Sequence, residues 1–442
     1  MTNGMDVDEE PDGGPLEQQR SSTLTDGQSM AIQSEKVEDL SPRTSLLSVA
    51  EHDNIMHLRW HPLASILAVG GEALCRLFRS ASVSEPMSSQ DILESGEPCC
   101  VTAMSWSPDG SSLAIATRAE SSETTATVST WSVTGKALDD LTAGQSLVIK
   151  LRWNLYGTML LGITSSGDGQ SSLVVWDVAQ SHSYPPVPCP KVMTDAVWSG
   201  DSSITVCGEG AIGRWDLASD QDITWAPKSN TQLSERQWTH IFCSPSSSSV
   251  IVFDEERGFV VLLDSHGSIL RFHQAHEDSI TGIASGSFFK PSSVIATSSL
   301  DGTVKIWTTN DFQPVSTLRF GQDAPPLTLA LNAEGSLLAA ANHSKVLVWD
   351  SSGNRVPIAM WRGELSKFPK SALTNGHSAD RDSGIGDDAT EDGINDPRVS
   401  LDWDSNGGRL AFAVGSQVSN ERRKMLGCAD IFCQIAIINV GP

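Results

Sequence analysis

The stretch SSLDGTVKIW, residues 298–307, reads as the end of one strand, a tight turn and a second strand that finishes on tryptophan. Its turn residues Asp301 and Gly302 can adopt the positive φ values that a two-residue hairpin requires. Looser versions of the motif occur as SSLVVWDV (171–178), AIGRWDL (211–217) and SKVLVWDS (344–351). Recurrence of one supersecondary motif is typical of a repeat architecture, in which each unit is completed by its neighbours.

A second series of segments shows the period of this repeat. Each segment is apolar and most end on tryptophan or a substitute for it: MHLRWHP (56–62), TAMSWSP (102–108), IKLRWNL (149–155), TDAVWSG (194–200), THIFCSP (239–245), ITGIASGSF (280–288), LTLALNA (327–333) and VSLDWDS (399–405). From Trp60 through Trp106, Trp153 and Trp198 to Cys243 the spacing is 46, 47, 45 and 45 residues. This period is typical of β-propeller blades and is too long for a helical repeat of about 34 residues.

Each unit continues with a turn and a second apolar run, such as LAIATR (113–118) after the SPDG turn at 107–110. Short, β-branched runs bounded by Gly, Ser, Pro or Asp favour strands over helices. Of the thirteen tryptophans, five end a first strand and five end a third strand, so large rings recur at two positions where neighbouring blades pack. The sequence therefore predicts an all-β propeller of eight four-stranded blades closed into a ring.

Over residues 50–442 the chain resembles the WD40 β-propellers. Three Trp-Asp pairs carry the resemblance: Trp176-Asp177, Trp215-Asp216 and Trp349-Asp350. The most complete unit is HEDSITGIASGSFFKPSSVIATSSLDGTVKIW, residues 276–307. For this unit the resemblance implies a structural chain of hydrogen bonds through His276, either Ser298 or Ser299, Asp301 and Trp307.

The same His276, serine and Asp301 also have the composition of a hydrolytic triad. No G-x-S-x-G elbow accompanies them, and the WD40 resemblance implies a buried brace instead. We therefore expect a protein without enzymatic activity.

Metal and nucleotide sites find little support in the sequence. The histidines at 52, 57 and 61 have a spacing that resembles metal ligands, and the Cys428 and Cys433 pair lacks two further ligands. The stretch SSGDGQSS (165–172) lacks the Gly-Lys-Ser/Thr ending of a phosphate loop, so a hairpin turn is the simpler reading. We expect no metal and no cofactor.

Charge and cysteine usage limit the partners and the compartment. With 30 basic and 54 acidic residues the formal net charge is -24, which disfavours direct binding of nucleic acid. The eight cysteines mostly stand singly in apolar runs, as expected in a reducing compartment. No segment has the pattern of a signal peptide or a membrane span. The expectation is a soluble intracellular protein that does not bind membranes.

Two polar segments hold about half of the net charge. Residues 1–45 are rich in Asp, Glu, Gly, Ser and Gln and are expected to form a disordered acidic tail ahead of the propeller. Residues 366–397 are acidic and aperiodic, and we expect a disordered insert between the last two blades. Within this insert, DSGIGDD (382–388) resembles a phosphorylation-dependent degradation signal, although a solvated loop is the simpler interpretation.

Among propellers, the chain resembles the transducin β-like subunits of histone-deacetylase corepressor complexes and their fungal counterparts. The resemblance rests on VTAMSWSPDGSSLAIAT (101–117), AVWSGDSSITVCGEGAI (196–212) and QAHEDSITGIA (274–284), the second with Cys207 and Glu209 in place of small residues. It implies a nuclear scaffold whose partners are corepressor and histone-deacetylase subunits and, given the acidic balance, histone tails. Residues 1–45 lack the helical dimerisation pattern of that group, so the oligomeric state stays open.

Candidate partner-binding residues lie in the loops that precede each first strand: Asp53, Asn54, Thr194, Trp238, Asp278 and Arg398. Such loops hold peptides or protein domains on a rigid disc. The alternative function is a substrate receptor or adaptor of a ubiquitin ligase, for which the degradation-like motif is the only clue.

Overall fold

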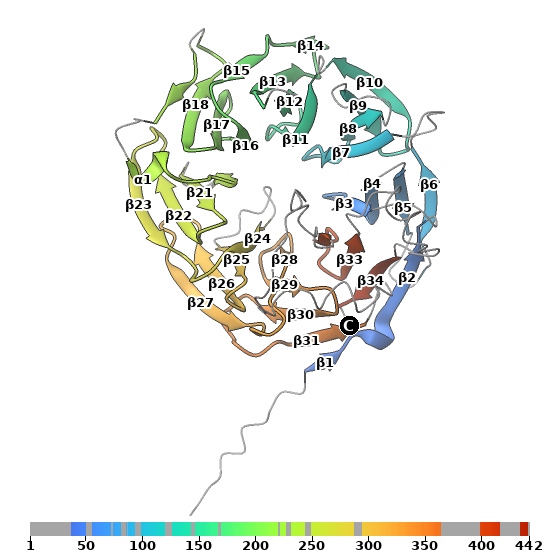
Figure 1. The fold of residues 1–442 in the computed structure, drawn as a ribbon. Coiled ribbons are helices and arrows are strands. Elements are labelled where there is room, and N and C mark those ends of the chain that lie inside the picture. The colour runs from blue at the N-terminus through green and yellow to red at the C-terminus, as the bar shows by residue number, and fades with distance from the viewer. Residues whose placement is uncertain are drawn as a thin grey trace, which may run out of the picture. The chain divides into compact units, whose positions relative to one another are not determined.

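The computed structural model describes residues 37–49, 55–71, 74–80, 85, 87–92, 99–119, 126–142, 146–166, 169–219, 222–226, 231–243, 249–286, 294–363, 398–415 and 434–440. These residues form eight sheets that follow one another around a ring (Figure 1). The prediction of an all-β, eight-bladed propeller is confirmed.

Within each blade the strands follow one another outward from the centre of the ring, and we name them a to d. The a strands are β3 (Ile55–Trp60), β7 (Cys99–Trp106), β11 (Leu147–Trp153), β16 (Met193–Trp198), β20 (His240–Cys243), β24 (Ile280–Ser285), β28 (Thr328–Leu331) and β32 (Arg398–Trp403). The b strands are β4 (Ile66–Gly71), β8 (Ser112–Ala119), β12 (Met159–Ser165), β17 (Ser203–Gly208), β21 (Val250–Asp254), β25 (Val294–Ser299), β29 (Leu337–Ala341) and β33 (Arg409–Gly415).

The c strands are β5 (Leu74–Arg79), β9 (Ala126–Ser132), β13 (Ser171–Asp177), β18 (Ala211–Asp216), β22 (Phe259–Leu263), β26 (Thr303–Thr308), β30 (Lys345–Asp350) and β34 (Gln434–Asn439). The d strands of blades 1 to 7 are β6 (Ser88–Asp91), β10 (Ala137–Thr142), β14 (His182–Ser183) with β15 (Val187–Cys189), β19 (Thr224–Trp225), β23 (Ile269–Gln274), β27 (Pro314–Arg319) and β31 (Ala359–Arg362). One short helix, α1 (Thr231–Ser234), precedes blade 5.

The outer strand of blade 8 comes from the beginning of the described chain. Strand β2 (Thr44–Ser48) pairs antiparallel with β34, and β1 (Glu38–Asp39) adds a parallel strand to β31; the 3-10 turn η1 (Ser41–Arg43) joins them. This differs from the predicted boundary, which placed residues 1–45 in a tail and began the propeller at 50. The short segment TSLLS has no strong strand pattern of its own. Its place in blade 8 cannot be predicted locally, because its pairing partner lies at the other end of the chain. Residues 1–36 and 366–397 lie outside the described residues.

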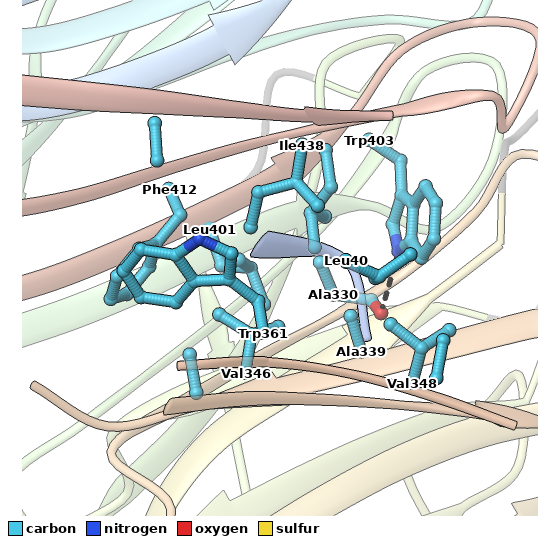
Figure 2. Close-up of a cluster of buried hydrophobic side chains, with 14 of the residues drawn as sticks. Leu40, Ala330, Ala339, Val346, Val348, Trp361, Leu401, Trp403, Phe412 and Ile438 are labelled. Carbon is cyan, nitrogen blue, oxygen red and sulfur yellow. Dashed lines mark hydrogen bonds between the residues drawn. The ribbon is translucent and has the colours of Figure 1, made fainter. Parts of the chain in front are cut away.

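The core of the ring consists of apolar clusters between adjacent blades. Figure 2 shows the cluster between blades 7 and 8, which includes Trp361, Phe412, Trp403, Ile438 and the fully buried Leu40. The rings of Trp361 and Phe412 meet edge to face, with centroids 5.3 Å apart. Leu40 lies between β1 and β2, so the segment that closes the ring also fills its core.

Tryptophans at the ends of the a strands join neighbouring blades by hydrogen bonds. Each indole N–H donates to a main-chain carbonyl of the preceding blade: Trp106 to Arg59 (3.2 Å), Trp153 to Ser105 (3.0 Å), Trp198 to Arg152 (3.1 Å) and Trp403 to Ala330 (3.1 Å). The acceptor is always the penultimate residue of the preceding a strand. At the closing seam the indole N–H of Trp60 has no partner among the described atoms, and its main-chain N–H donates to Asp402 instead.

Threonines near the starts of three a strands join the blades on the opposite side of the ring. Their hydroxyls donate to main-chain carbonyls of the next blade: Thr102 to Val148, Thr194 to Trp238 and Thr281 to Pro326. The two sides are named here by their connections. The DA face carries the d-to-a and b-to-c connections, and the AB face carries the a-to-b and c-to-d turns.

Candidate interaction surface

Blade 6 contains a buried chain of hydrogen bonds that ties its DA face to its core. The indole N–H of Trp307 donates to Oγ1 of Thr297 (2.9 Å), which lies 2.7 Å from Nε2 of His276. Nδ1 of His276 lies 3.0 Å from Oδ2 of Asp301, which caps the b-to-c turn by accepting the N–H of Thr303. His276, Asp301 and Trp307 are thus connected as the sequence resemblance implied.

The hydroxyl in this chain belongs to Thr297 and not to Ser298 or Ser299, which corrects the sequence interpretation. Side chains of a strand alternate between its two faces, so position 298 points away from Trp307. Ser298 bonds Thr281 on that other face (2.9 Å), and Ser299 donates to the carbonyl of Asp278 (3.1 Å). The register of β25 against β26 determines which of these adjacent residues faces Trp307.

The environment of His276 favours a structural brace. Burial lowers the pKa of His276, although the neighbouring Asp301 carboxylate opposes this shift, and the ring is therefore neutral at pH 7. Both ring nitrogens are bonded inside the blade, and Thr297 is fully buried. A hydrolytic triad needs a hydroxyl that a substrate can reach, and this hydroxyl does not meet that requirement.

In each of the three Trp-Asp pairs the tryptophan packs in the core and the aspartate stabilises a turn. Trp176, Trp215 and Trp349 are buried between blades. The carboxylates of their aspartates accept hydrogen bonds in the c-to-d turns on the AB face: Asp177 from Gln180 N–H (3.0 Å), Asp216 from Ala218 N–H (3.1 Å) and Asp350 from Ser352 N–H (2.8 Å). These pairs therefore stabilise the scaffold.

Histidine 61, one of the residues with metal-like spacing, also braces a turn. Its Nε2 lies 2.9 Å from the carbonyl oxygen of Gly110, and its Nδ1 accepts the N–H of Leu63 (3.0 Å). Among the described residues, no cluster of three or more His, Cys, Asp or Glu side chains is placed to hold a metal ion. His52 and the Cys428 and Cys433 pair lie outside the described residues.

The predicted partner-binding residues have different positions in the structure. Thr194 donates its hydroxyl across a blade seam, and Trp238 is fully buried, so neither is presented to a partner as the sequence interpretation expected. Both residues lie at the seam between blades 4 and 5. The side chain of Trp238 is buried there because it packs in one cluster with Cys207 and Ile212. Asp278 is exposed on the DA face. Arg398 is the first residue of β32, but its side chain is not among the described ones. Asp53 and Asn54 lie outside the described residues.

The loop that carries Trp238 forms a fixed platform on the DA face between blades 4 and 5. The indole of Trp238 donates to the carbonyl of Leu233 in α1 (3.0 Å). Arg236 lies over the ring of Phe259, 3.8 Å from its centroid, and pairs with the buried Asp254 (3.1 Å). The sequence singled out Trp238 as a partner-binding residue rather than a buried one and did not point to Arg236, because the partners of Arg236 belong to the next blade.

Six carboxylates surround this platform on the DA face of blades 4 to 6. This set, called the acidic patch, comprises Glu209, Glu235, Glu255, Glu256, Glu277 and Asp278, all exposed except the half-buried Glu255. Hydrogen bonds from side chains to the main chain connect their loops: the guanidinium of Arg257 donates to the carbonyl of Glu235 (3.4 Å), and the hydroxyl of Ser279 donates to that of Glu256 (2.9 Å). Two exposed cations, Lys191 and Arg257, accompany them. Carboxylates therefore dominate this surface.

An ion pair joins the a strands of neighbouring blades. Arg152 contacts both carboxylate oxygens of Asp195 (2.8 and 3.0 Å from Nη2), and the main-chain N–H of Ile241 donates to the same group (3.2 Å). Burial opposes ionisation of Asp195, but Arg152 and Lys150 outweigh it and hold its pKa below the usual value. Asp195 thereby joins blades 3, 4 and 5.

A second carboxyl group, that of Asp402, lies at the seam between blades 8 and 1. Its Oδ2 accepts the main-chain N–H of Trp60 (2.8 Å). Desolvation raises the pKa of Asp402 to about 6, although Arg59 and the N–H groups of Trp60 and Trp403 oppose the shift. This value is above that of an aspartate in an unfolded chain, so protonation favours the folded state.

We expect Asp402→Asn to change how stability depends on pH. The stabilisation due to Asp402 is fully present below pH 4 and is lost as pH rises through about 6. Between pH 5 and pH 7 the wild type should lose about 1 kcal/mol of unfolding free energy relative to the variant. Urea denaturation at both pH values measures this difference. Asp140→Asn on the exposed β10 is the control, and an equal pH response in wild type and Asp402→Asn would contradict the expectation.

Comparisons with known proteins agree with this architecture. A family model described as "WD domain, G-beta repeat" matches residues 267–308, which include the hydrogen-bonded chain of blade 6. No curated protein matches the chain in sequence. Within the described part of the chain, no helical segment has the length and apolar character that a bilayer crossing demands.

Solved structures are similar to the chain over most of its length. The C-terminal WD40 domain of Sif2 has 16% identity and a TM-score of 0.64, covering 92% of this chain and 99% of that one. Saccharomyces cerevisiae Sqt1 has 14% identity and a TM-score of 0.59, with coverage of 90% and 98%. A chain of a mitotic checkpoint complex has 16% identity and a TM-score of 0.52, with coverage of 81% and 100%. At these identities the similarity shows the fold, a WD40-type propeller, a class typical of protein-interaction scaffolds.

Proposed function

We propose that the protein is a non-catalytic scaffold whose DA face binds basic segments of partner proteins, within a nuclear histone-deacetylase corepressor complex. The acidic patch carries this proposal. It places exposed carboxylates of three adjacent blades on one surface, and opposite charges on two surfaces increase the association rate and select the partner.

The platform beside the patch supports the same role. Arg236 and Trp238 hold the loop between blades 4 and 5, which carries Glu235, by an ion pair and an indole hydrogen bond. Binding to such a surface requires little ordering of the protein, which lowers its entropic cost. Histone tails are basic, and they are complementary to this surface in charge.

The assignment to a corepressor complex rests on the sequence resemblance. Two of the three stretches that carry it, 196–212 and 274–284, also contribute to the acidic patch, through Glu209, Glu277 and Asp278. The resemblance and the proposed binding surface therefore involve the same part of the ring.

Charge reversal in the patch should weaken binding of a basic peptide. We expect Glu277→Lys combined with Asp278→Lys to reduce affinity for a fluorescein-labelled histone tail peptide at least 10-fold, because two attractive charges become repulsive. Fluorescence anisotropy at two salt concentrations measures the effect, which should shrink at high salt. The matched control is Asp139→Lys with Asp140→Lys on the exposed β10 of blade 2. Equal losses in both variants would indicate a response to net charge and contradict a specific site.

The complex itself is tested by affinity purification of the tagged full-length protein from its own cells, followed by mass spectrometry. Recovery of a histone deacetylase with corepressor subunits supports the proposal. Recovery of cullin or other ubiquitin-ligase components without a deacetylase would overturn it in favour of a substrate-receptor role. The charge-reversed variant shows in the same experiment which partners need the acidic patch.

A further inference from the structure

The AB face carries a pocket of about 410 Å³ between the ends of the a strands of blades 2 to 5. Its lining includes Trp106, Trp153 and Trp198, together with Tyr156 and Cys243. Strands β7, β11 and β16 follow one another around the centre of the ring at this place (Figure 1). The hydroxyl of Tyr156 donates to Asp201 (3.1 Å) and so links two a-to-b turns at the rim.

The pocket lies where other blades place an indole. At four seams the tryptophan that ends an a strand donates to the penultimate carbonyl of the preceding a strand. In blade 5 this position is occupied by Cys243. Cys243 pairs with Val250 on the b strand of blade 5, just as Trp198 pairs with Ile204 on the b strand of blade 4. The corresponding acceptor is the carbonyl of Val197, which lines the same pocket. Cysteine is much smaller than tryptophan, and Cys243 and Val197 both line the pocket where an indole would be expected.

Two partly exposed cations lie at or near this pocket. Side chains of Lys150 and Arg152 are 33% and 36% exposed, whereas their counter-ion Asp195 is fully buried and already accepts main-chain N–H groups. Arg59 on β3 is also exposed. Two carboxylates accompany them: Asp201, which lines the pocket and accepts the hydroxyl of Tyr156, and the half-buried Glu255, which raises the pKa of Lys150 while burial lowers it. These cations contrast with the net charge of -24 of the whole chain.

We propose that this pocket binds a tryptophan side chain of a partner peptide whose flanking residues are acidic. The indole occupies the space beside Trp198 and donates its N–H to the carbonyl of Val197, as the protein's own tryptophans do at four other seams. The flanking carboxylates face Arg59, Lys150 and Arg152. The site lies on the face opposite the acidic patch, so it gives the scaffold a second and chemically different partner.

The probe for this site is a fluorescein-labelled peptide, Glu-Asp-Glu-Trp-Glu-Asp-Glu, measured by fluorescence anisotropy. We expect binding that weakens at least 10-fold when the peptide's tryptophan is replaced by alanine. Cys243→Trp should weaken binding at least 10-fold as well, because the new indole fills the pocket and takes the Val197 carbonyl. Absence of binding, or equal affinity for the alanine peptide, would overturn the proposal.

Two further variants keep the test decisive if Cys243→Trp does not fold. Leu155→Glu places a charge on the exposed rim and should also weaken peptide binding at least 10-fold. Leu138→Glu on β10 is the matched control, since it makes the same change at an exposed leucine far from the pocket. Affinity for the histone tail peptide should be unchanged in all three variants, so failure of this site can be distinguished from failure of the acidic patch.

Discussion

Deletion of residues 1–48 is expected to remove most of the stability of the propeller. Those residues include β2, which supplies the outer strand of blade 8 and pairs with β34 from Thr44 to Ser48. They also include Leu40, which is fully buried between blades 7 and 8. Loss of that side chain costs about 2–4 kcal/mol, and the exposed edge of β34 adds to this. The total is a large share of the 5–15 kcal/mol that typically stabilises a domain.

Thermal unfolding followed by circular dichroism measures this effect, and we expect a decrease in Tm of more than 10 °C or insoluble protein. Deletion of residues 1–36 is the control and should leave Tm unchanged, because every described strand begins after Val37. A circular permutant with residues 37–49 linked after residue 442 should recover the wild-type Tm, since β2 and the end of β34 are neighbours. A wild-type Tm for the 1–48 deletion would contradict this account of ring closure.

Substitution of Thr297 by valine is expected to destabilise the fold by about 3 kcal/mol. Valine keeps the shape of threonine but removes the hydroxyl that connects His276 and Trp307. Both rings stay buried, so two polar groups lose their partners, at about 1–3 kcal/mol each. Denaturant unfolding gives the difference in free energy.

The control for this substitution is Ser298→Ala, one position along the same strand. Ser298 shares a single hydrogen bond with Thr281, which keeps its bond to the carbonyl of Pro326, so the cost should stay below about 1 kcal/mol. His276→Ala should resemble Thr297→Val, because it breaks the same chain. If Ser298→Ala proved the more harmful of the two neighbours, the serine predicted from the sequence would be the correct member.

The sequence predicted the blades because each blade is a local structure. Strand alternation, turn residues such as Asp301-Gly302 and the spacing of the tryptophans all act within about 45 residues, so they can be recognised without knowing the rest of the chain. The WD40 resemblance implied the roles of His276, Asp301 and Trp307, and the position of Asp278 just ahead of a first strand placed it in a loop. For the acidic patch, the sequence supplied the charges but not their gathering on one surface.

Tertiary structure alone decided how the blades meet. The pairing of β2 with β34 joins the two ends of the chain, and TSLLS has no local feature that reveals it. The choice of Thr297 over its neighbours depended on register, since a shift of one residue turns a side chain to the other face of the sheet. Burial of Trp238 and the pocket lined by Cys243 depended on side chains from the adjacent blades. Hairpins are encoded by neighbours in sequence, whereas the seams are formed by residues that only the closed ring brings together.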